Sequence, residues 1–112
     1  MDEKKAESAM QIILYAGNAR SKCKKALDAI AITDFEEAKN SLERAKVEIT
    51  QAHRIQTDAI QSECSGEVGE YSVLFAHAQD TLMTVNSEII IAKQMISIFE
   101  NYERRIAALE NK

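Results

Sequence analysis

The sequence has no proline and no tryptophan, and only three glycines and two cysteines among its 112 residues. Because proline and glycine most often interrupt a helix, their scarcity predicts few breaks and long helices. The two cysteines, Cys23 and Cys64, show neither the spacing of metal ligands nor a framework of pairs. We interpret both as buried thiols in a reducing cytosol, with a disulfide between them as the alternative.

The chain also lacks a large net charge of either sign. The chain has 14 Lys and Arg against 18 Asp and Glu, a net charge of −4, and its basic residues are scattered apart from a small cluster within residues 20–25. That balance argues against a general nucleic-acid-binding surface. The longest aliphatic runs, such as Ile89-Ile90-Ile91-Ala92, are far shorter than a membrane span, and the first residues lack the apolar core of a signal peptide. We therefore expect a cytoplasmic protein whose residues 1–112 form one domain.

What the chain does have is apolar residues at helical spacing. Steps of three and four residues predict three helices, at about residues 3–32, 34–64 and 71–110. The expected fold class is all-α, with three long antiparallel helices in an up-down bundle. The expected core stripes are Ala9, Ile12, Ala16, Ala19, Cys23, Ala26 and Ile30; then Phe35, Ala38, Leu42, Ala45, Ile49 and Ala52; then Leu74, Ala78, Leu82, Val85, Ile89, Ala92, Ile96, Phe99 and Ile106.

Two turn signals separate the predicted helices. Thr33-Asp34-Phe35-Glu36 is typical of a capping box, in which the Thr33 hydroxyl caps the second helix. Gly66 suits the left-handed position that ends that helix, and the third helix should start near Tyr71 or Ser72.

Gly17 lies inside the first predicted helix, where glycine costs about 1 kcal/mol relative to alanine. We expect a close helix contact to explain it, with a gap for a partner or substrate side chain as the alternative.

The third predicted helix carries more apolar surface than two neighbouring helices can cover. Beside its core stripe lies a second stripe, made of Ile91, Met95, Ile98, Tyr102 and Leu109. This surplus predicts a contact with another copy of the chain.

A polar patch interrupts the apolar pattern at the start of the third helix. His77, Asp80, Thr81 and Thr84 fall on neighbouring strips of one helical face, because residues three, four and seven apart stack along the axis. Such a patch suits chemistry, whereas a satisfied interface histidine beside a solvated aspartate is the plainer interpretation.

A second polar set lies on the second helix, at His53, Gln56 and Thr57. It suits a water-filled interface or the wall of a site.

The residues around the first patch resemble a known signature. His77-Ala78-Gln79-Asp80-Thr81-Leu82-Met83-Thr84 is similar to HAQDHLMT, the pattern of the enzyme IIA component of the sugar phosphotransferase system, lactose/cellobiose (chitobiose) type. Tyr15-Ala16-Gly17-Asn18-Ala19-Arg20-Ser21 resembles the YAGDARS of the same family. Residues 52–57 and 59–66 resemble the stretch between them, so the resemblance covers nearly the whole chain in order.

The resemblance implies three antiparallel helices that assemble as a homotrimer, and a phosphocarrier function. It implies that His77 takes a phosphoryl group from phospho-HPr and passes it to a cysteine of the cognate IIB, which serves the membrane component IIC. For Asp80 it implies a buried position on the trimer axis, where three copies bind one divalent metal, expected to be Mg²⁺. The sugar stays open, because the membrane component selects it.

Two positions depart from the family pattern. Thr81 stands where many members have a second histidine, and Asn18 stands where many have aspartate. Loss of the second imidazole predicts slower transfer or a regulatory relative, although a threonine hydroxyl can still hydrogen-bond a phosphoryl oxygen.

Phosphoryl transfer to a protein needs a nucleophile that is unprotonated near neutral pH, and an imidazole with a pKa of about 6.5 meets that need. The transition state is loose, so positioning and charge stabilisation dominate. We expect supporting roles for Thr81, Gln79 and Gln56, with His53 in a more distant one.

Asp80 has two interpretations. It either orients the His77 ring or meets its two copies on a symmetry axis, where three carboxylates require a cation. We expect the metal site on the symmetry axis.

Two other functions could use the same residues. One is a non-catalytic trimeric helical interaction module, and the other is a metalloenzyme built on His77 and Asp80, for which no third ligand is in view.

Overall fold

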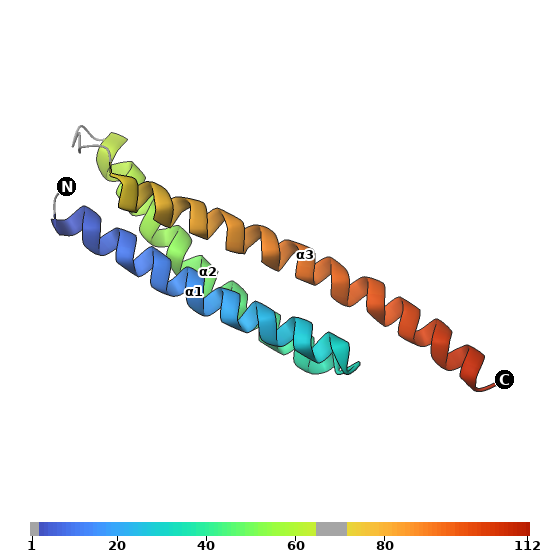
Figure 1. Cartoon of the computed structure of the whole chain (residues 1–112). Coiled ribbons are helices and arrows are strands. Elements are labelled where there is room, and N and C mark those ends of the chain that lie inside the picture. The colour runs from blue at the N-terminus through green and yellow to red at the C-terminus, as the bar shows by residue number, and fades with distance from the viewer. Residues whose placement is uncertain (1–2, 65–71) are drawn as a thin grey trace.

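The computed structural model describes residues 3–64 and 72–112. Three helices account for them: α1 (Glu3–Ala31), α2 (Phe35–Cys64) and α3 (Val73–Glu110). α1 and α3 run in one direction, and α2 runs antiparallel to both of them (Figure 1). The predicted all-α, up-down bundle is confirmed, with helix bounds within two residues of those expected. Tyr71 and the expected helix end at Gly66 lie outside the described residues.

The core is a thin layer of small side chains between the three helices. Ten of the nineteen buried apolar residues are alanine, so the helix axes can approach closely along most of the bundle. The predicted stripes supply almost all of this core. The exceptions at the edges are Ala29, which is buried beside a half-buried Ile30, and Phe75, which is buried in place of Leu74.

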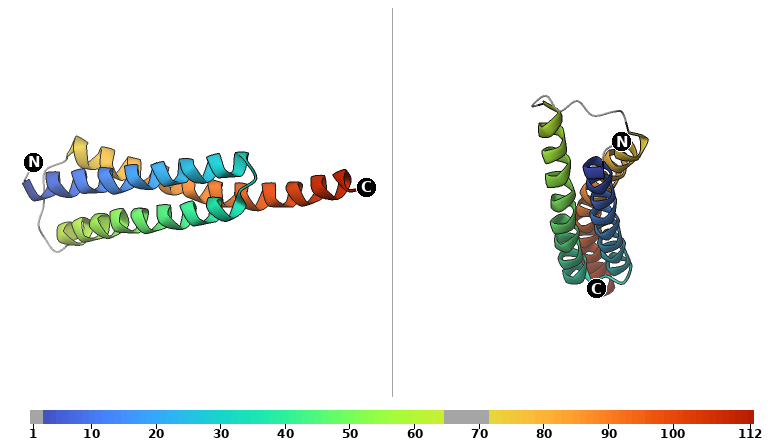
Figure 2. Two further views of the ribbon diagram at one scale, coloured as in Figure 1. Left: turned by 90° about the horizontal axis from the view of Figure 1, so that it is seen from below. Right: turned by 90° about the vertical axis from the view of Figure 1, so that its left-hand side faces the viewer.

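α3 is longer than the helices it packs against. It has 38 residues against 29 in α1 and 30 in α2, and its last turns extend alone past the turn that joins α1 to α2 (Figures 1 and 2). Phe99 and Ile106 were expected in the packed stripe, but they are 46% and 48% exposed. That expectation is wrong for the single chain. Ile106 lies where α3 extends past the other described helices, whereas Phe99 lies next to Glu100, which pairs with Lys39 of α2, and is only partly covered there.

Ion pairs between the helices mark their register. Lys5 on α1 pairs with Glu63 at the end of α2 at 2.8 Å, and Lys39 on α2 pairs with Glu100 on α3 at 2.8 Å. Exposed pairs of this kind contribute only about 0–1 kcal/mol. They therefore show which residues lie level with one another, while the apolar core holds the bundle together.

The cap of α2 lies one residue later than expected. Thr33 adopts a left-handed conformation, with φ 59°, and its hydroxyl donates to the carbonyl oxygen of Ile32. The Asp34 carboxylate instead accepts a hydrogen bond from the backbone N–H of Glu37 at 3.2 Å. The prediction that Thr33 caps this helix is wrong, because Thr33 is needed to close α1 and turn the chain.

Gly17 does not have the close helix contact expected of it. It is exposed in the middle of α1, and a Cβ placed on it would meet nothing within 4 Å. The packing reason for this glycine is therefore absent from the single chain.

By length and composition alone, α3 could cross a membrane, and 28% of its most apolar window is buried in the bundle. The same properties are expected of a core helix in a bundle, which is the role α3 has here. Its exposed apolar residues include all of the second stripe, together with Val73, Met83, Ile90, Phe99 and Ile106.

The capping geometry makes opposite predictions for two neighbouring residues. Asp34→Ala should lower the free energy of unfolding by about 1 kcal/mol, because the N–H of Glu37 loses its partner. Thr33→Gly should raise it by up to about 1 kcal/mol, because glycine adopts a positive φ without the clash of a Cβ. Urea unfolding followed by circular dichroism measures both. A Thr33→Gly variant destabilised as much as Asp34→Ala would contradict this assignment.

Candidate functional site

His77 lies in the second turn of α3, on a helix start that is held firmly. The Ser72 hydroxyl accepts a hydrogen bond from the N–H of Phe75 at 3.1 Å and caps the helix. The Phe75 ring is buried, and Lys5 Nζ lies 5.3 Å from its centroid. The cap at Ser72 and the buried Phe75 ring thus hold the backbone just before His77, while the His77 side chain itself is exposed to solvent.

The predicted polar patch is present on one face of α3. His77, Asp80 and Thr84 are exposed and Thr81 is half-buried. The Thr81 hydroxyl donates to the carbonyl oxygen of His77 at 2.9 Å, and the Thr84 hydroxyl donates to that of Asp80 at 2.8 Å. Both hydroxyl protons are therefore used within the helix. Thr81 would have to rotate before it could donate to a phosphoryl oxygen.

The side chains of His77 and Asp80 do not interact with each other. Across residues 3–64 and 72–112, no hydrogen bond or ion pair involves the His77 ring or the Asp80 carboxylate. The interpretation in which Asp80 orients the ring gains no support from this geometry. An exposed, uncommitted imidazole suits transfer between proteins, since both the donor and the acceptor must reach the same nitrogen.

The other predicted site residues lie apart from His77. Because Lys39 pairs with Glu100, His53 on antiparallel α2 is level with Asn86 of α3, about 13 Å along the axis from His77. Gln56 is one turn nearer, and half-buried Gln79 lies beside the core stripe of α3. No hydrogen bond joins any of them to His77 in the described part of the chain.

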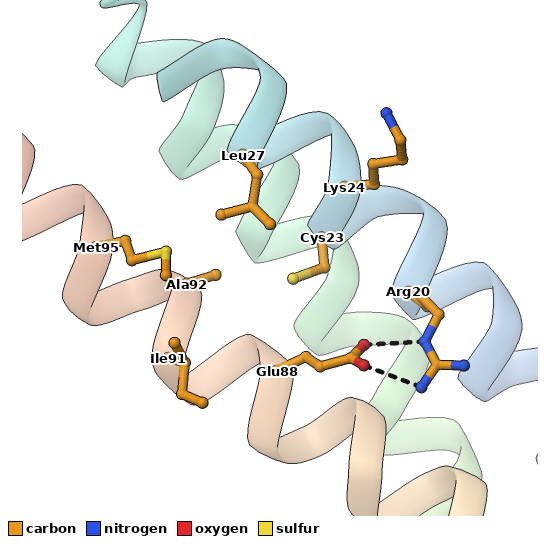
Figure 3. Close-up of a pocket in the computed structure, with 8 residues that line it drawn as sticks. All are labelled: Arg20, Cys23, Lys24, Leu27, Glu88, Ile91, Ala92 and Met95. Atoms are coloured by element: carbon orange, nitrogen blue, oxygen red, sulfur yellow. Dashed lines mark hydrogen bonds and ion pairs between the residues drawn. The ribbon is translucent and has the colours of Figure 1, made fainter. Parts of the chain in front are cut away.

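The sequence interpretation missed a groove between α1 and α3 (Figure 3). Residues 20–27 of α1 form one wall, residues 88–95 of α3 form the other, and the space has a volume of about 200 Å³. Its lining residues are Arg20, Cys23, Lys24, Leu27, Glu88, Ile91, Ala92 and Met95. The steps of three and four between them were visible in the sequence, but the register of α1 against α3 was not.

A bidentate ion pair between Arg20 and Glu88 crosses the groove at one end. Arg20 Nε and Nη2 donate to the two carboxylate oxygens of Glu88 at 2.9 and 3.0 Å (Figure 3). The hydrogen bond to Glu88 raises the pKa of the Arg20 guanidinium, and partial burial opposes that rise. Burial raises the pKa of the neighbouring Cys23 thiol, and the charge of Glu88 adds to the effect.

Comparison with known proteins identifies this arrangement. The family described as "PTS system, Lactose/Cellobiose specific IIA subunit" matches residues 7–100. The chain belongs to this family. It is 38% identical over 110 residues to the lichenan-specific phosphotransferase enzyme IIA component of Bacillus subtilis (strain 168), covering 97% of this chain and 100% of that protein.

Solved structures of IIA proteins share the fold. The PTS cellobiose-specific enzyme IIA from Bacillus anthracis superposes with a TM-score of 0.87 at 38% identity, over 93% of this chain and 95% of that one. The IIA(Chitobiose) chain in its complex with HPr, from Escherichia coli, superposes with a TM-score of 0.74 at 28% identity, over 92% and 99%. The resemblance carried by the motifs around His77 and Gly17 is thereby confirmed, and the chain is a phosphotransferase-system IIA component.

A metal site is not complete within one IIA chain. The described residues contain no group of three or more His, Cys, Asp or Glu side chains that could hold an ion. Asp80 offers one exposed carboxylate. A hard divalent ion prefers six or more oxygen ligands, so Asp80 fits such an ion only together with copies of itself and water.

The two cysteines differ, contrary to the expectation that both are buried. Cys23 is 3% exposed in the groove wall, whereas Cys64 is exposed at the end of α2, and both thiols are free. Cys64 lies on the last turn of a helix, past the stripe that ends at Ala52, so little packs against it.

This difference predicts two rates of thiol modification. With a disulfide-exchange reagent at pH 8, Cys64 should react about a hundredfold faster than Cys23, because burial and a raised pKa leave Cys23 with little accessible thiolate. Cys64→Ser should remove the fast phase and Cys23→Ser the slow one. Two thiols that react at one rate would contradict the burial of Cys23.

Proposed function

We propose that His77 is the residue of this IIA protein that carries the phosphoryl group. The observation that supports the proposal most is the accessible imidazole on a firmly capped helix start, inside the motif shared with the family. A ring nitrogen attacks the phosphorus of phospho-HPr, a P–N bond forms, and the bond to the HPr histidine breaks. In the second transfer, the sulfur of a cysteine on the cognate IIB attacks the same phosphorus and frees His77.

HPr is the proposed donor because a structural neighbour, IIA(Chitobiose), is solved in complex with HPr. The proposed acceptor is a IIB protein that passes the group on to sugar at the membrane component IIC. Both partners must use the face around His77 in turn, so the contacts should be small and short-lived. We place the protein in the cytoplasm, where these partners meet it.

Thr81 is the supporting residue with the clearest structural basis. Its hydroxyl is bonded to the His77 carbonyl at 2.9 Å, so it acts on the backbone that bears the nucleophile. Roles for Gln79, Gln56 and His53 stay predictions, since among the described residues no hydrogen bond joins them to His77.

We also propose that the working unit is a homotrimer with α3 at its centre. The exposed second stripe of α3 supports this, because Ile91, Met95 and Ile98 stay about half exposed in the described part of the bundle. Alternating steps of four and three residues match the seam of helices packed in parallel. In such a trimer the Asp80 carboxylates converge, and a divalent cation, expected to be Mg²⁺, would offset their mutual repulsion.

A non-catalytic trimeric module is the second candidate function. The Thr81 departure favours it, because no imidazole stands four residues after His77 and the Thr81 hydroxyl is already engaged.

Substitution of His77 separates the two functions. After incubation with phosphoenolpyruvate, enzyme I and HPr, the wild-type mass should increase by one acid-labile phosphoryl group per chain. His77→Ala should abolish the increase, because the nucleophilic nitrogen is gone, and His53→Ala should retain it. Intact-mass spectrometry before and after acid treatment measures this. If the wild type gains no mass while HPr is phosphorylated, the non-catalytic module is the better description.

Asp80 gives the corresponding test for the metal. A chelator should lower the melting temperature of the wild-type trimer, because uncompensated carboxylates repel one another. Asp80→Asn should make the melting temperature insensitive to the chelator, whereas Asp58→Asn, an exposed aspartate on α2, should leave the response unchanged. Equal chelator responses in wild type and Asp80→Asn would contradict a metal at Asp80.

A further inference from the structure

Lys5 contacts both other helices at the end of the bundle that carries His77. The start of α1, the end of α2 and the start of α3 all lie at this end (Figure 1). Lys5 Nζ on α1 lies 2.8 Å from Glu63 Oε1 on α2 and 5.3 Å from the centroid of the Phe75 ring on α3. The Lys5 side chain is only 14% exposed. A lysine is rarely enclosed to this extent unless its charge is compensated, and here a carboxylate and an aromatic face both compensate it.

These two contacts lie close to the point where α3 begins. Glu63 is one residue before the end of α2, and Phe75 is in the first turn of α3. The first N–H groups of a helix have no partner within it, so this turn opens more easily than those that follow. The N–H of Phe75 donates to the Ser72 hydroxyl, and the N–H of Ala76 donates to the Ser72 carbonyl oxygen at 3.0 Å. His77 is the next residue, so opening of this turn displaces the imidazole.

Lys5 contacts the core side of α3 and not the reacting imidazole. Phe75 is 6% exposed and faces the core, whereas the His77 side chain faces solvent. Residues two apart on a helix point to nearly opposite sides, so the ring that Lys5 covers lies across the helix from the imidazole. An effect of Lys5 on transfer must therefore pass through the backbone at the start of α3.

Lys5 also lies outside the segment that the family model matches, which is residues 7–100. The motifs that pointed to His77 therefore contain no signal for this contact. It depends on α1 starting at Glu3, early enough in the sequence for its first turn to reach the level of Phe75.

We propose that Lys5 is a positioning residue for phosphoryl transfer, which keeps the first turn of α3 closed and the His77 ring aligned for attack. The inference rests on the proposed function of His77 and adds the contact that holds this nucleophile in place. Transfer through a loose transition state depends mainly on alignment, so a displacement of about 1 Å can slow it by up to about a hundredfold. Docking of phospho-HPr uses a whole face of the protein and is much less sensitive to that displacement.

The test compares Lys5→Met with Lys5→Arg and with a matched control, Lys4→Met. Methionine keeps the apolar stem of Lys5 and removes its charge, whereas arginine can still pair with a carboxylate and cover a ring. Lys4 is an exposed lysine on the same turn, so its substitution changes the net charge equally. Rapid-quench kinetics over a range of phospho-HPr concentrations give the limiting rate constant of transfer and the half-saturating concentration. Amide hydrogen exchange at residues 75–77 measures opening of the first turn of α3.

The expected effect of Lys5→Met is on the rate of transfer and not on docking. Its limiting rate constant should fall by about tenfold, while the half-saturating concentration of phospho-HPr changes by less than about twofold. Exchange of the amides of residues 75–77 should become about tenfold faster, while the amides of residues 85–96 exchange as in the wild type. Lys5→Arg should restore both quantities to within about threefold of the wild type, and Lys4→Met should leave both unchanged.

Four results would overturn the proposal while the proposed function stands. Lys5→Met could accept the phosphoryl group as fast as the wild type, or Lys4→Met could slow transfer equally, which would show a general effect of charge. The half-saturating concentration could rise at an unchanged limiting rate, which would make Lys5 part of the docking face. Transfer could slow without faster exchange at residues 75–77. If the wild type itself gains no phosphoryl group from phospho-HPr, the proposed function and this inference fail together.

Discussion

The apolar surface of α3 exceeds what its own chain can bury, and this imbalance governs the rest of the structure. α1 and α2 cover one side of α3 for most of its length, and the last turns of α3 extend past the turn that joins α1 to α2 (Figures 1 and 2). Large side chains on the remaining side, from Ile91 to Leu109, are between 37% and 66% exposed. Burying a fully exposed side chain of this size is favourable by about 1.5–3 kcal/mol, so each of these partly buried ones would contribute roughly half of that when α3 associates with other helices.

The same face of α3 changes from apolar to polar on the way to its N-terminus, where His77 and Asp80 lie. In the function proposed above, one helix serves two purposes: its later turns favour assembly and its early turns carry the chemistry. A nucleophile placed near an assembly surface gains rigid positioning without being enclosed. This suits a phosphocarrier, since two different proteins must reach one imidazole while the transition state needs little more than alignment and charge compensation.

Most of the fold could be predicted from the sequence because its core pattern is regular. The alanine and isoleucine stripes repeat at three and four residues with few breaks, so the three helices and their buried faces followed directly. The errors lie where one local signal competed with another. Thr33 and Asp34 are both good caps, and only the turn geometry, with Thr33 at a positive φ, decides between them. Cys64 and Ile106 were misjudged because periodicity does not show where a partner helix ends.

The site could be predicted less completely. His77 came from a motif and a resemblance, and its exposure agrees with both. The groove beside Cys23 depends on the axial register of α1 against α3, which no short-range pattern contains. The open space at Gly17 depends on the same register. Among the described residues the Asp80 carboxylate has no partner, and the symmetry-axis position proposed for it depends on other copies, which the sequence of one chain does not place.

The central claim is that other copies of the chain cover the outer face of α3, and amide hydrogen exchange at Asn101–Glu110 tests it most directly. The end of this segment extends past the other described helices (Figures 1 and 2), and an isolated helical extension frays in water. The account predicts strong protection of these amides at high protein concentration, lost on dilution while the amides of α1 and α2 stay protected. Rapid exchange of Asn101–Glu110 at every concentration, in a sample whose bundle core is fully protected, would contradict it.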